Sequence, residues 1–229
     1  ARDRMGEKPL YFGWQGDQDN KVFLFGSEIK ALKAHPVFKG EINRDAVALQ
    51  LRHNCVPAPF SIFKDIYKLL PGHYLQLKED DLKKNLLPNS KAYWSWADKA
   101  VVGNNNQLIL NDGNSQQNLE NLLKKSVKQQ MLSDVPLGAF LSGGIDSSVI
   151  VSMMQSQSIK PVKTFTIGFS ENHYNEAIYA KDVAKHLGTD HTELYVSPKQ
   201  AMDIIPKIPS IYDEPFSDSS QIPTFLVSQ

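Results

Sequence analysis

The stretch Leu141-Ser142-Gly143-Gly144-Ile145-Asp146-Ser147-Ser148 decides the fold class that we predict for this chain. It follows an apolar run, residues 135–141, that predicts a β-strand, and it precedes a segment, residues 147–155, that predicts a helix. The two glycines allow the backbone to turn with positive φ and let a bulky ligand approach the main chain. Backbone N–H groups in such a turn, with the unpaired N–H groups that begin the helix, form a site for an anion.

The serines of this stretch add hydroxyl donors, so the turn can hold a phosphate or a pyrophosphate without a cationic side chain. Asp146 would repel a phosphate unless a cation lies between them, and Mg²⁺ prefers one or two carboxylates together with phosphate oxygens. No lysine follows the glycines, so the stretch is not a Walker A loop. It is not a G-x-G-x-x-G dinucleotide fingerprint either. The competing interpretation is an ordinary strand-to-helix turn in which Ser and Asp act as caps.

The second half of the chain alternates between predicted helices and predicted strands. A helix that Ser115 can cap has its apolar face at Leu119, Leu122, Leu123, Val127 and Met131. Further helices are expected at 147–155 and 176–187, and the strands at 135–141, 162–169 and 193–196. Gly188 predicts a helix end, and Ser197 followed by Pro198 predicts a helix start. This alternation predicts an α/β fold whose parallel strands are joined by right-handed crossovers.

The first half has a different pattern. Two aromatic-rich runs, 10–14 and 22–25, predict a β-hairpin, and Asn43 is a candidate N-cap for a helix over 44–53. The remaining expectations for this half are a helical turn at 27–34, a strand at 73–77, a solvated loop at 79–89, and a linker with a domain boundary at 101–115.

Composition excludes several classes of protein. The 229 residues include 25 Lys and Arg against 25 Asp and Glu, a balance that argues against a protein built to coat nucleic acid. No run of about 18 apolar residues predicts a membrane span. A single cysteine, Cys55, cannot form an internal disulfide or a multi-cysteine zinc site, and we interpret it as a small buried apolar residue. These features predict a cytoplasmic protein without a nucleic-acid or membrane partner.

The segment Ser142-Gly143-Gly144-Ile145-Asp146-Ser147 matches the SGG-x-DS signature of PP-loop ATP pyrophosphatases. Residues 134–144 resemble, within that group, the glutamine-dependent asparagine synthetase family. The other segments that carry this resemblance are 1–11, 25–32, 69–73, 164–169, 187–191 and 213–220. The resemblance therefore extends over nearly the whole chain and is weakest over 77–115.

The resemblance implies a parallel sheet of PP-loop type with helices on both faces, preceded by a β-rich remnant of an Ntn-type glutaminase domain. The implied organisation is a glutaminase remnant at 1–40, a connecting region at 41–115 and the N-terminal half of the synthetase domain at 116–229. Members of such families commonly pair, which implies a possible homodimer.

The resemblance also implies a reaction. ATP binds with Mg²⁺, the carboxylate of aspartate attacks the α-phosphorus, and pyrophosphate leaves an acyl-adenylate. Ammonia cut from glutamine then displaces AMP and gives asparagine. Asp146 would hold the metal ion, and the main chain at two strand ends would contact adenosine. The complete set of implied nucleotide-binding residues is Leu141, Ser142, Gly143, Gly144, Asp146, Ser147, Ser148 and Ile167.

Two departures from the family pattern lead us to expect a piece of a longer polypeptide that does not complete the reaction alone. The family uses an N-terminal Cys as the glutaminase nucleophile, whereas residue 1 is Ala, and Cys55 is not expected to replace it. A later Ser-Gly-x-Gly-x-Asp-Glu segment of the family, which supplies a second metal carboxylate, does not occur in the sequence. The acceptor could instead be another carboxylate, as in β-lactam synthetase or surface-sugar amidation, and a non-catalytic nucleotide-binding module is the third alternative.

Two further groups of polar residues have open roles. His191 follows Gly188-Thr189-Asp190, and we favour a structural role for it over a place near the nucleotide. Asp213, Glu214 and Asp218 form a carboxylate cluster that belongs either to a fixed loop near the substrate or to a solvated helix start.

Overall fold

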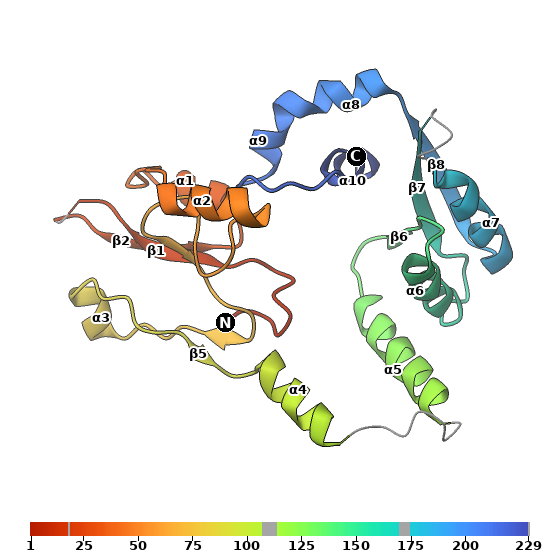
Figure 1. Ribbon diagram of the computed structural model, residues 1–229, viewed down its shortest axis with the longest axis horizontal. Helices are drawn as coiled ribbons and strands as arrows, with labels where there is room; N and C mark the ends of the chain where they lie inside the picture. Colours follow the sequence, from red (N-terminus) through yellow and green to blue (C-terminus); the bar gives the residue numbers. More distant parts are fainter. Residues whose placement is uncertain (18, 107–113, 170–174, 229) are drawn as a thin grey trace. The chain divides into compact units, whose positions relative to one another are not determined.

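The computed structural model describes residues 1–17, 19–106, 114–169 and 175–228. The chain divides into two compact units, each with its own hydrophobic core (Figure 1). The first unit is made of residues 1–106 and 207–218, and the second of residues 107–206 and 219–229. Nothing in the sequence indicated that residues 207–218 belong with the beginning of the chain.

The first unit contains a three-stranded antiparallel sheet in the order β2-β1-β3. Strand β1 (Tyr11–Gln15) pairs with β2 (Val22–Gly26) on one side and with β3 (Ile66–Lys68) on the other. This arrangement confirms the hairpin predicted from the aromatic-rich runs. The strand expected at 73–77 is reduced to β4 (His73–Tyr74), which pairs with β5 (Lys91–Ala92).

Two helices cover the core of the first unit. Helix α1 (Ile29–Lys33) contributes Ile29, which is completely buried, and α2 (Arg44–His53) contributes Ala46. The Asn43 side chain accepts hydrogen bonds from two N–H groups in the first turn of α2, as expected for an N-cap. The sequence therefore predicted the bounds and the cap of α2 correctly.

Two segments that we expected to be irregular are helical. Helix α3 (Glu79–Lys83) occupies part of the expected loop at 79–89, with three acidic residues in its first turn, where the helix dipole favours them. Helix α4 (Trp96–Asn105) extends into the expected linker at 101–115, and the Ser95 side chain caps it by accepting from Asp98 N at 3.3 Å. The Gly-Asn run therefore did not exclude a helix that begins at a well-capped residue upstream. Residues 107–113 of that linker lie outside the described residues.

The second unit contains a three-stranded parallel sheet in the order β6-β7-β8, which confirms the predicted strand direction. Strand β6 (Gly138–Phe140) pairs with β7 (Lys163–Phe169), and β7 pairs along its full length with β8 (Asp190–Val196). Strand β6 is shorter than expected and β8 is longer.

The helices of the second unit are joined to the sheet by two small hydrophobic cores. Helices α6 (Ile145–Gln155) and α7 (Ala177–Leu187) pack together on the first core, whose buried members are Leu141, Val151, Ala180 and Ala184. Helix α5 (Ser115–Gln130) packs on α6 through the second core, whose buried members are Val127, Met154 and Val162. Gly188 ends α7 in the left-handed conformation, as predicted.

The prediction for α5 was partly wrong. Val127 is buried and Met131 packs beside it, but Leu119 is 58% exposed and Leu122 is 66% exposed. The helix contacts α6 through its last turns, so its first apolar residues are left uncovered within this unit. Asn114, and not Ser115, takes the N-cap position.

The remaining helices are short. Helix α8 (Pro198–Ile204) begins as predicted, with the Ser197 hydroxyl accepting from Gln200 N at 3.3 Å. A 3-10 turn (Ile205–Lys207) leads to α9 (Ile208–Ile211), and α10 (Gln221–Val227) lies against β7 within the second unit. Among the described residues, no helix is both long and apolar enough to cross a membrane.

Candidate functional site

The turn between β6 and α6 depends on one glycine. Gly143 has φ +79°, and a Cβ atom at this position would lie 2.7 Å from Ala180 N and 2.7 Å from the Cβ of Tyr179, both on α7. Gly143 is therefore required both by its backbone conformation and by the close approach of α7. Gly144 has φ −72° and ψ 162° at the N-cap of α6, a conformation open to any residue. The expectation that both glycines supply positive φ is right for Gly143 and wrong for Gly144.

Two serine hydroxyls hold the turn in shape. The hydroxyl oxygens of Ser142 and Ser147 are 2.9 Å apart, and Ser147 Oγ accepts from Ser142 N at 3.2 Å. Gly144 N donates to Ser142 Oγ at 3.3 Å. These are long hydrogen bonds to hydroxyls that rotate freely, so both N–H groups can exchange them for bonds to the oxygens of a ligand.

Asp146 and Ser148 occupy the first turn of α6 in different surroundings. The side chain of Asp146 is exposed and forms no hydrogen bond or ion pair with another described residue. The Ser148 hydroxyl is buried and finds no hydrogen-bond partner among the described residues. The described part of the chain contains no group of three or more His, Cys, Asp or Glu that could hold a metal ion by itself. One carboxylate beside an anion site nevertheless fits Mg²⁺, which takes most of its ligands from phosphate and water.

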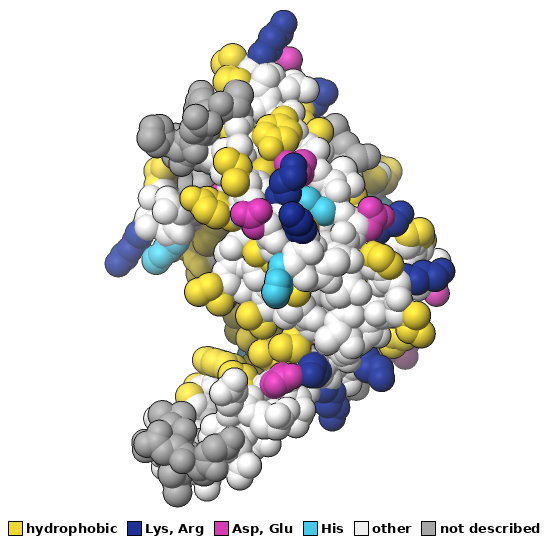
Figure 2. All heavy atoms as spheres, turned by 90° about the vertical axis from the view of Figure 1, so that its right-hand side faces the viewer, with side chains coloured by type: hydrophobic (Ala, Val, Ile, Leu, Met, Phe, Trp, Pro, Cys, Tyr) yellow, Lys and Arg dark blue, Asp and Glu magenta, His cyan; other side chains and the backbone are white. Residues whose placement is uncertain are grey.

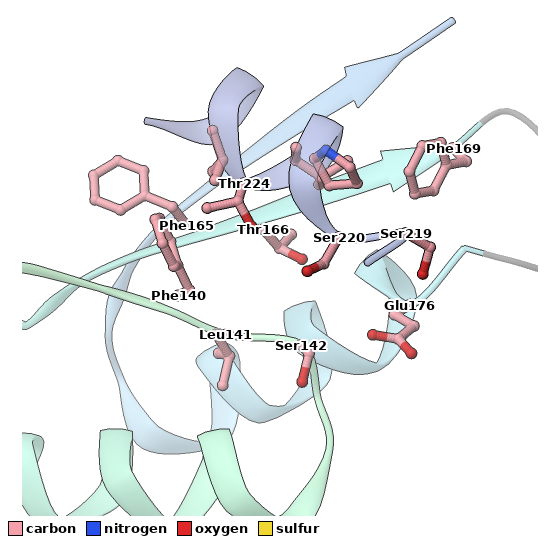
Figure 3. A pocket seen from close by; sticks show the side chains of 13 residues that line it. Phe140, Leu141, Ser142, Phe165, Thr166, Phe169, Glu176, Ser219, Ser220 and Thr224 are labelled. Atoms are coloured by element: carbon pink, nitrogen blue, oxygen red, sulfur yellow. The ribbon is translucent and has the colours of Figure 1, made fainter. Parts of the chain in front are cut away.

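A cavity of about 690 Å³ lies beside the turn, within the range of small-molecule sites (Figure 3). Figure 3 shows Phe140 and Phe165 on one side of it and Ser142, Ser219, Ser220 and Glu176 on the other. The full lining is Phe140, Leu141, Ser142, Phe165, Thr166, Ile167, Phe169, Glu176, Ser219, Ser220, Pro223, Thr224 and Val227. The cavity therefore joins an apolar wall, suited to a planar base, to a polar end.

Three of the predicted site residues, Leu141, Ser142 and Ile167, line this cavity. The other five belong to the adjacent turn and do not line it: Gly143, Gly144, Asp146, Ser147 and Ser148. Sequence reasoning missed Glu176 and the residues that α10 and the chain before it contribute. Ser219 and Ser220 stood in a segment that carried the family resemblance, but that segment gave no indication that it lies against β7.

His191 is placed away from the cavity. It pairs with Thr164 at the amino ends of β8 and β7, whereas the turn follows the carboxyl end of β6. Its Nδ1 lies 2.9 Å from the Thr164 hydroxyl, and burial lowers the pKa of the imidazole below its ordinary value. The structural role that we favoured from the sequence agrees with these contacts.

Asp213 is a helix cap that acts from a distant part of the sequence. Helix α1 receives no side-chain cap from Glu28, its own N-cap residue. Instead, the Asp213 carboxylate accepts from Ile29 N at 2.6 Å and from Lys30 N at 3.1 Å. These contacts lie within the first unit, and they fix residues 207–218 to the beginning of the chain.

The Glu214 carboxylate has three partners among the described residues of the first unit. Its carboxylate accepts from Ile62 N at 2.7 Å and from the Tyr11 hydroxyl at 3.1 Å, and it lies 2.5 Å from Lys68 Nζ. Burial, followed by the charge of Glu214, raises the pKa of Tyr11 above its ordinary range. Of the two interpretations left open for Asp213 and Glu214, the solvated helix start is therefore wrong, because both carboxylates are largely buried and satisfied.

The expectation that Cys55 is a buried apolar residue is wrong. The chain leaves α2 through Asn54, which has a left-handed conformation with φ 62°, and the following Cys55 is exposed. Val56 takes the buried position instead, at 3% exposure. The single thiol is therefore an accessible group and not a core residue.

Figure 2 shows the side of the molecule that carries α7 and β8. Lysine, arginine and acidic side chains are interspersed there with hydrophobic ones, and Lys181 pairs with Glu193 at 2.9 Å. On this face the described residues form no cationic stripe of the kind that follows a nucleic-acid backbone.

Two family models match the chain in succession. A glutamine amidotransferase domain matches residues 1–94, and an asparagine synthase domain matches residues 118–229. Among curated proteins, the chain is 37% identical to a putative glutamine-hydrolysing asparagine synthetase 2 of Methanocaldococcus jannaschii, over 100% of this chain and 42% of the relative. It is 34% identical to the glutamine-hydrolysing asparagine synthetase 1 of Bacillus subtilis, over 100% of this chain and 33% of that protein.

A more distant relative is the asparagine synthetase B of Escherichia coli, which is 27% identical over 90% of this chain and 31% of its own length. The chain thus spans about two fifths or less of the length of these relatives. The two domain types follow one another along this chain, and its similarity to the first two relatives extends over its whole length. The chain belongs to the glutamine-hydrolysing asparagine synthetase family.

Proposed function

We propose that the second unit binds ATP as part of an enzyme that amidates aspartate. In this proposal the carboxylate of aspartate attacks the α-phosphorus of ATP, pyrophosphate leaves, and an acyl-adenylate forms. Ammonia released from glutamine then displaces AMP and yields asparagine. The observation that carries the proposal is the turn of Gly143, with its N–H groups and hydroxyls, at the end of β6 and beside a cavity of nucleotide size.

The turn would act on the leaving pyrophosphate. The N–H groups of Ser142 and Gly144 and the hydroxyl of Ser147 are close together and already oriented. Donors fixed in place before the reaction stabilise the charge that develops as a leaving group departs, without the cost of reorganising water. We assign the same role to Gly143 and Ser148, and we assign the adenosine to the strand ends at Leu141 and Ile167, which line the cavity.

Asp146 would hold Mg²⁺. Its carboxylate stands in the first turn of α6, next to the proposed phosphate donors, and would otherwise repel the nucleotide. The metal ion supplies charge neutralisation of the phosphates when it is bound. Residues 1–94, which match the amidotransferase model, all lie in the first unit, and we assign the handling of glutamine to the complete form of that domain. We do not assign glutamine cleavage to Cys55, and we expect that this chain alone does not complete the reaction.

A second candidate function keeps the turn and changes the acceptor. The donors of the turn would contact phosphate and not the acid that is activated, so an amidation of another carboxylate, of a surface sugar or of a β-lactam precursor, uses the same turn. The third candidate is a module that binds a nucleotide without catalysis.

Calorimetric titration with Mg-ATP tests the proposal on the wild-type chain and on Gly143→Val, Asp146→Ala and Asp203→Ala. Asp203 is an exposed residue of α8 outside the turn and the cavity, so its variant is the control. We expect wild type and Asp203→Ala to bind with a Kd of about 1 mM or lower, and the other two at least about tenfold more weakly. Equal binding by all four would contradict the proposed site.

The acceptor is tested on the full-length protein. Release of pyrophosphate is measured with aspartate and with other carboxylates at equal concentrations. Release that requires aspartate supports the first candidate, and release with another acid supports the second. Nucleotide binding without any release favours the module.

A further inference from the structure

The cavity beside the turn contains one feature that the proposed nucleotide site does not use. Among the described residues that line it, Glu176 is the one with a charged side chain. Figure 3 shows its carboxylate at the polar end, near Ser142 and Ser219. The Glu176 carboxylate forms no hydrogen bond or ion pair with another described residue.

Helix capping does not account for Glu176. The residue stands at the N-cap position of α7, yet its side chain makes no capping hydrogen bond. The neighbouring Asn175 supplies that contact, because its Oδ1 accepts from Ala177 N at 3.2 Å. The structure therefore leaves the Glu176 carboxylate available to the cavity.

A negative charge is unfavourable in a cavity that receives anions. ATP and aspartate both bring negative groups, and two like charges at close range repel unless a cation lies between them. The carboxylate of Glu176 would thus weaken binding of both substrates unless one of them brings a positive group to it. The α-ammonium of an amino acid is such a group, since it has three donors for carboxylate and hydroxyl acceptors.

We propose that Glu176 binds the α-ammonium group of the acceptor and thereby selects an α-amino acid over a plain dicarboxylic acid. The inference rests on the proposed function, and it deepens that function by naming the residue that recognises the ammonium group of the acceptor. The neutral hydroxyls of Ser142 and Ser219 flank the carboxylate and serve carboxylate or ammonium groups equally, so the discrimination comes from Glu176. A charge-assisted hydrogen bond of this kind is stronger than one between neutral groups.

The test compares L-aspartate with succinate, which has the same two carboxylates and lacks the ammonium group. Both acids are titrated by calorimetry into the wild-type chain, with and without Mg-AMPCPP, a non-hydrolysable ATP analogue. The variants are Glu176→Gln, which keeps the shape and removes the charge, and Asp182→Asn, which makes the same charge change on the exposed side of α7.

We expect wild type and Asp182→Asn to bind aspartate at least about tenfold more tightly than succinate. In Glu176→Gln the Kd for aspartate should rise about tenfold to that of succinate, and the Kd for Mg-AMPCPP should not increase. A preference that survives in Glu176→Gln, or a wild-type chain that binds neither acid or both equally, overturns the inference. Weaker binding of Mg-AMPCPP by Glu176→Gln also overturns it, because the carboxylate would then serve the metal ion.

The failure of this inference and the failure of the proposed function are distinguishable. The nucleotide titration of the Gly143 and Asp146 variants decides whether the turn binds phosphates, and it does not involve Glu176. In one outcome, nucleotide binding depends on the turn while the preference for aspartate over succinate does not depend on Glu176. That result would support the nucleotide site and contradict the role of Glu176 in binding the acceptor.

Discussion

Two polar segments of this chain, the turn at 142–148 and the acidic pair Asp213–Glu214, are both candidates for contact with a ligand when only the sequence is considered. In the structure they differ in what their polar atoms contact. The hydroxyls of Ser142 and Ser147 are partly exposed and accept long, exchangeable hydrogen bonds from N–H groups of the turn, and the exposed Asp146 carboxylate has no partner among the described residues. The acidic pair is largely buried, and its oxygens are occupied by N–H groups, a phenol and a lysine.

The difference teaches that burial and partners separate a structural polar cluster from a binding site. Satisfied buried carboxylates stabilise a fold, and their removal leaves unpaired donors behind. Open donors around a conformationally fixed glycine contribute little to stability and remain free for a ligand. Substitutions in the two segments should therefore have opposite effects on folding and on nucleotide binding.

The largest loss of stability is expected for Glu214→Ala. The change leaves Lys68 without its carboxylate and Ile62 N without its acceptor in a part of the first unit that is largely buried. Breaking such a pair costs about 3–5 kcal/mol. All 3 tryptophans, Trp14, Trp94 and Trp96, lie in the first unit, so their fluorescence in a urea titration measures its free energy of unfolding.

The matched control is Glu41→Ala, which removes an exposed ion pair with Lys64 in the same unit. Exposed pairs contribute about 0–1 kcal/mol, so the two variants should differ several-fold in their effect on unfolding. Equal effects would contradict the view that Glu214 is a structural carboxylate.

The next largest effect on stability is expected from substitution of Gly143 in the turn, and its neighbour Gly144 is the control. Gly143→Ala places a Cβ 2.7 Å from Ala180 N at a positive φ and should destabilise the second unit by about 1–3 kcal/mol. Gly144→Ala meets only Ser142 Oγ, at 3.3 Å, and should cost less than about 1 kcal/mol. The amide NMR signals of residues in the core of the second unit, such as Val151 and Ala184, monitor this unit during urea unfolding. A larger cost for Gly144→Ala would show that the turn has another conformation.

In a third pair of variants, one substitution is expected to lower the stability of the first unit and the other to weaken nucleotide binding. Asp213→Ala removes the acceptor of two N–H groups of α1 and should cost about 1–2 kcal/mol in the first unit. Asp146→Ala removes an exposed carboxylate and should change unfolding by less than about 0.5 kcal/mol, while it weakens Mg-ATP binding. If Asp146→Ala instead unfolds the second unit and leaves nucleotide binding intact, the distinction between the segments fails.

The smallest expected effect is a dependence of the stability of the second unit on pH. Burial lowers the pKa of His191 below 6.5, the value of the free side chain; the charge of Glu193 raises this pKa by a smaller amount, and the charge of Lys181 lowers it further. The unfolded chain therefore takes up this proton more readily, so stability present above pH 6.5 is lost as the pH falls through the folded pKa. The thermal midpoint of the second unit should fall as the pH is lowered below 6.5, and it should fall less in His191→Gln. A folded-state NMR titration of His191 at or above pH 6.5 would contradict this.

The sequence allowed the turn to be predicted because its chemistry is local. The glycines, serines and aspartate stand within a few residues of one another, and the strand and helix around them have clear hydrophobic patterns. The cap of α2 by Asn43 and the parallel direction of β6, β7 and β8 were predictable for the same reason.

What could not be predicted depends on contacts between distant residues. Glu214 bonds to Tyr11 and Ile62, and no local pattern announces partners so far away in the sequence. The cavity wall formed by α10 and the place of Glu176 also depend on which elements lie against β7. The helix α4 was missed because its Gly-Asn run suggested a linker, although Ser95 upstream is an effective cap.

The central claim, that the turn binds the phosphates of ATP, is tested most directly by amide NMR. Mg-ATP is added to the ¹⁵N-labelled chain, and the N–H signals of Ser142, Gly143 and Gly144 are followed. The account predicts saturable shifts at these amides, together with shifts at Leu141 and Ile167 and none at Ile29 and Lys30, whose N–H groups are bonded to Asp213. Shifts confined to other parts of the chain, with these three amides unchanged at saturation, would contradict it.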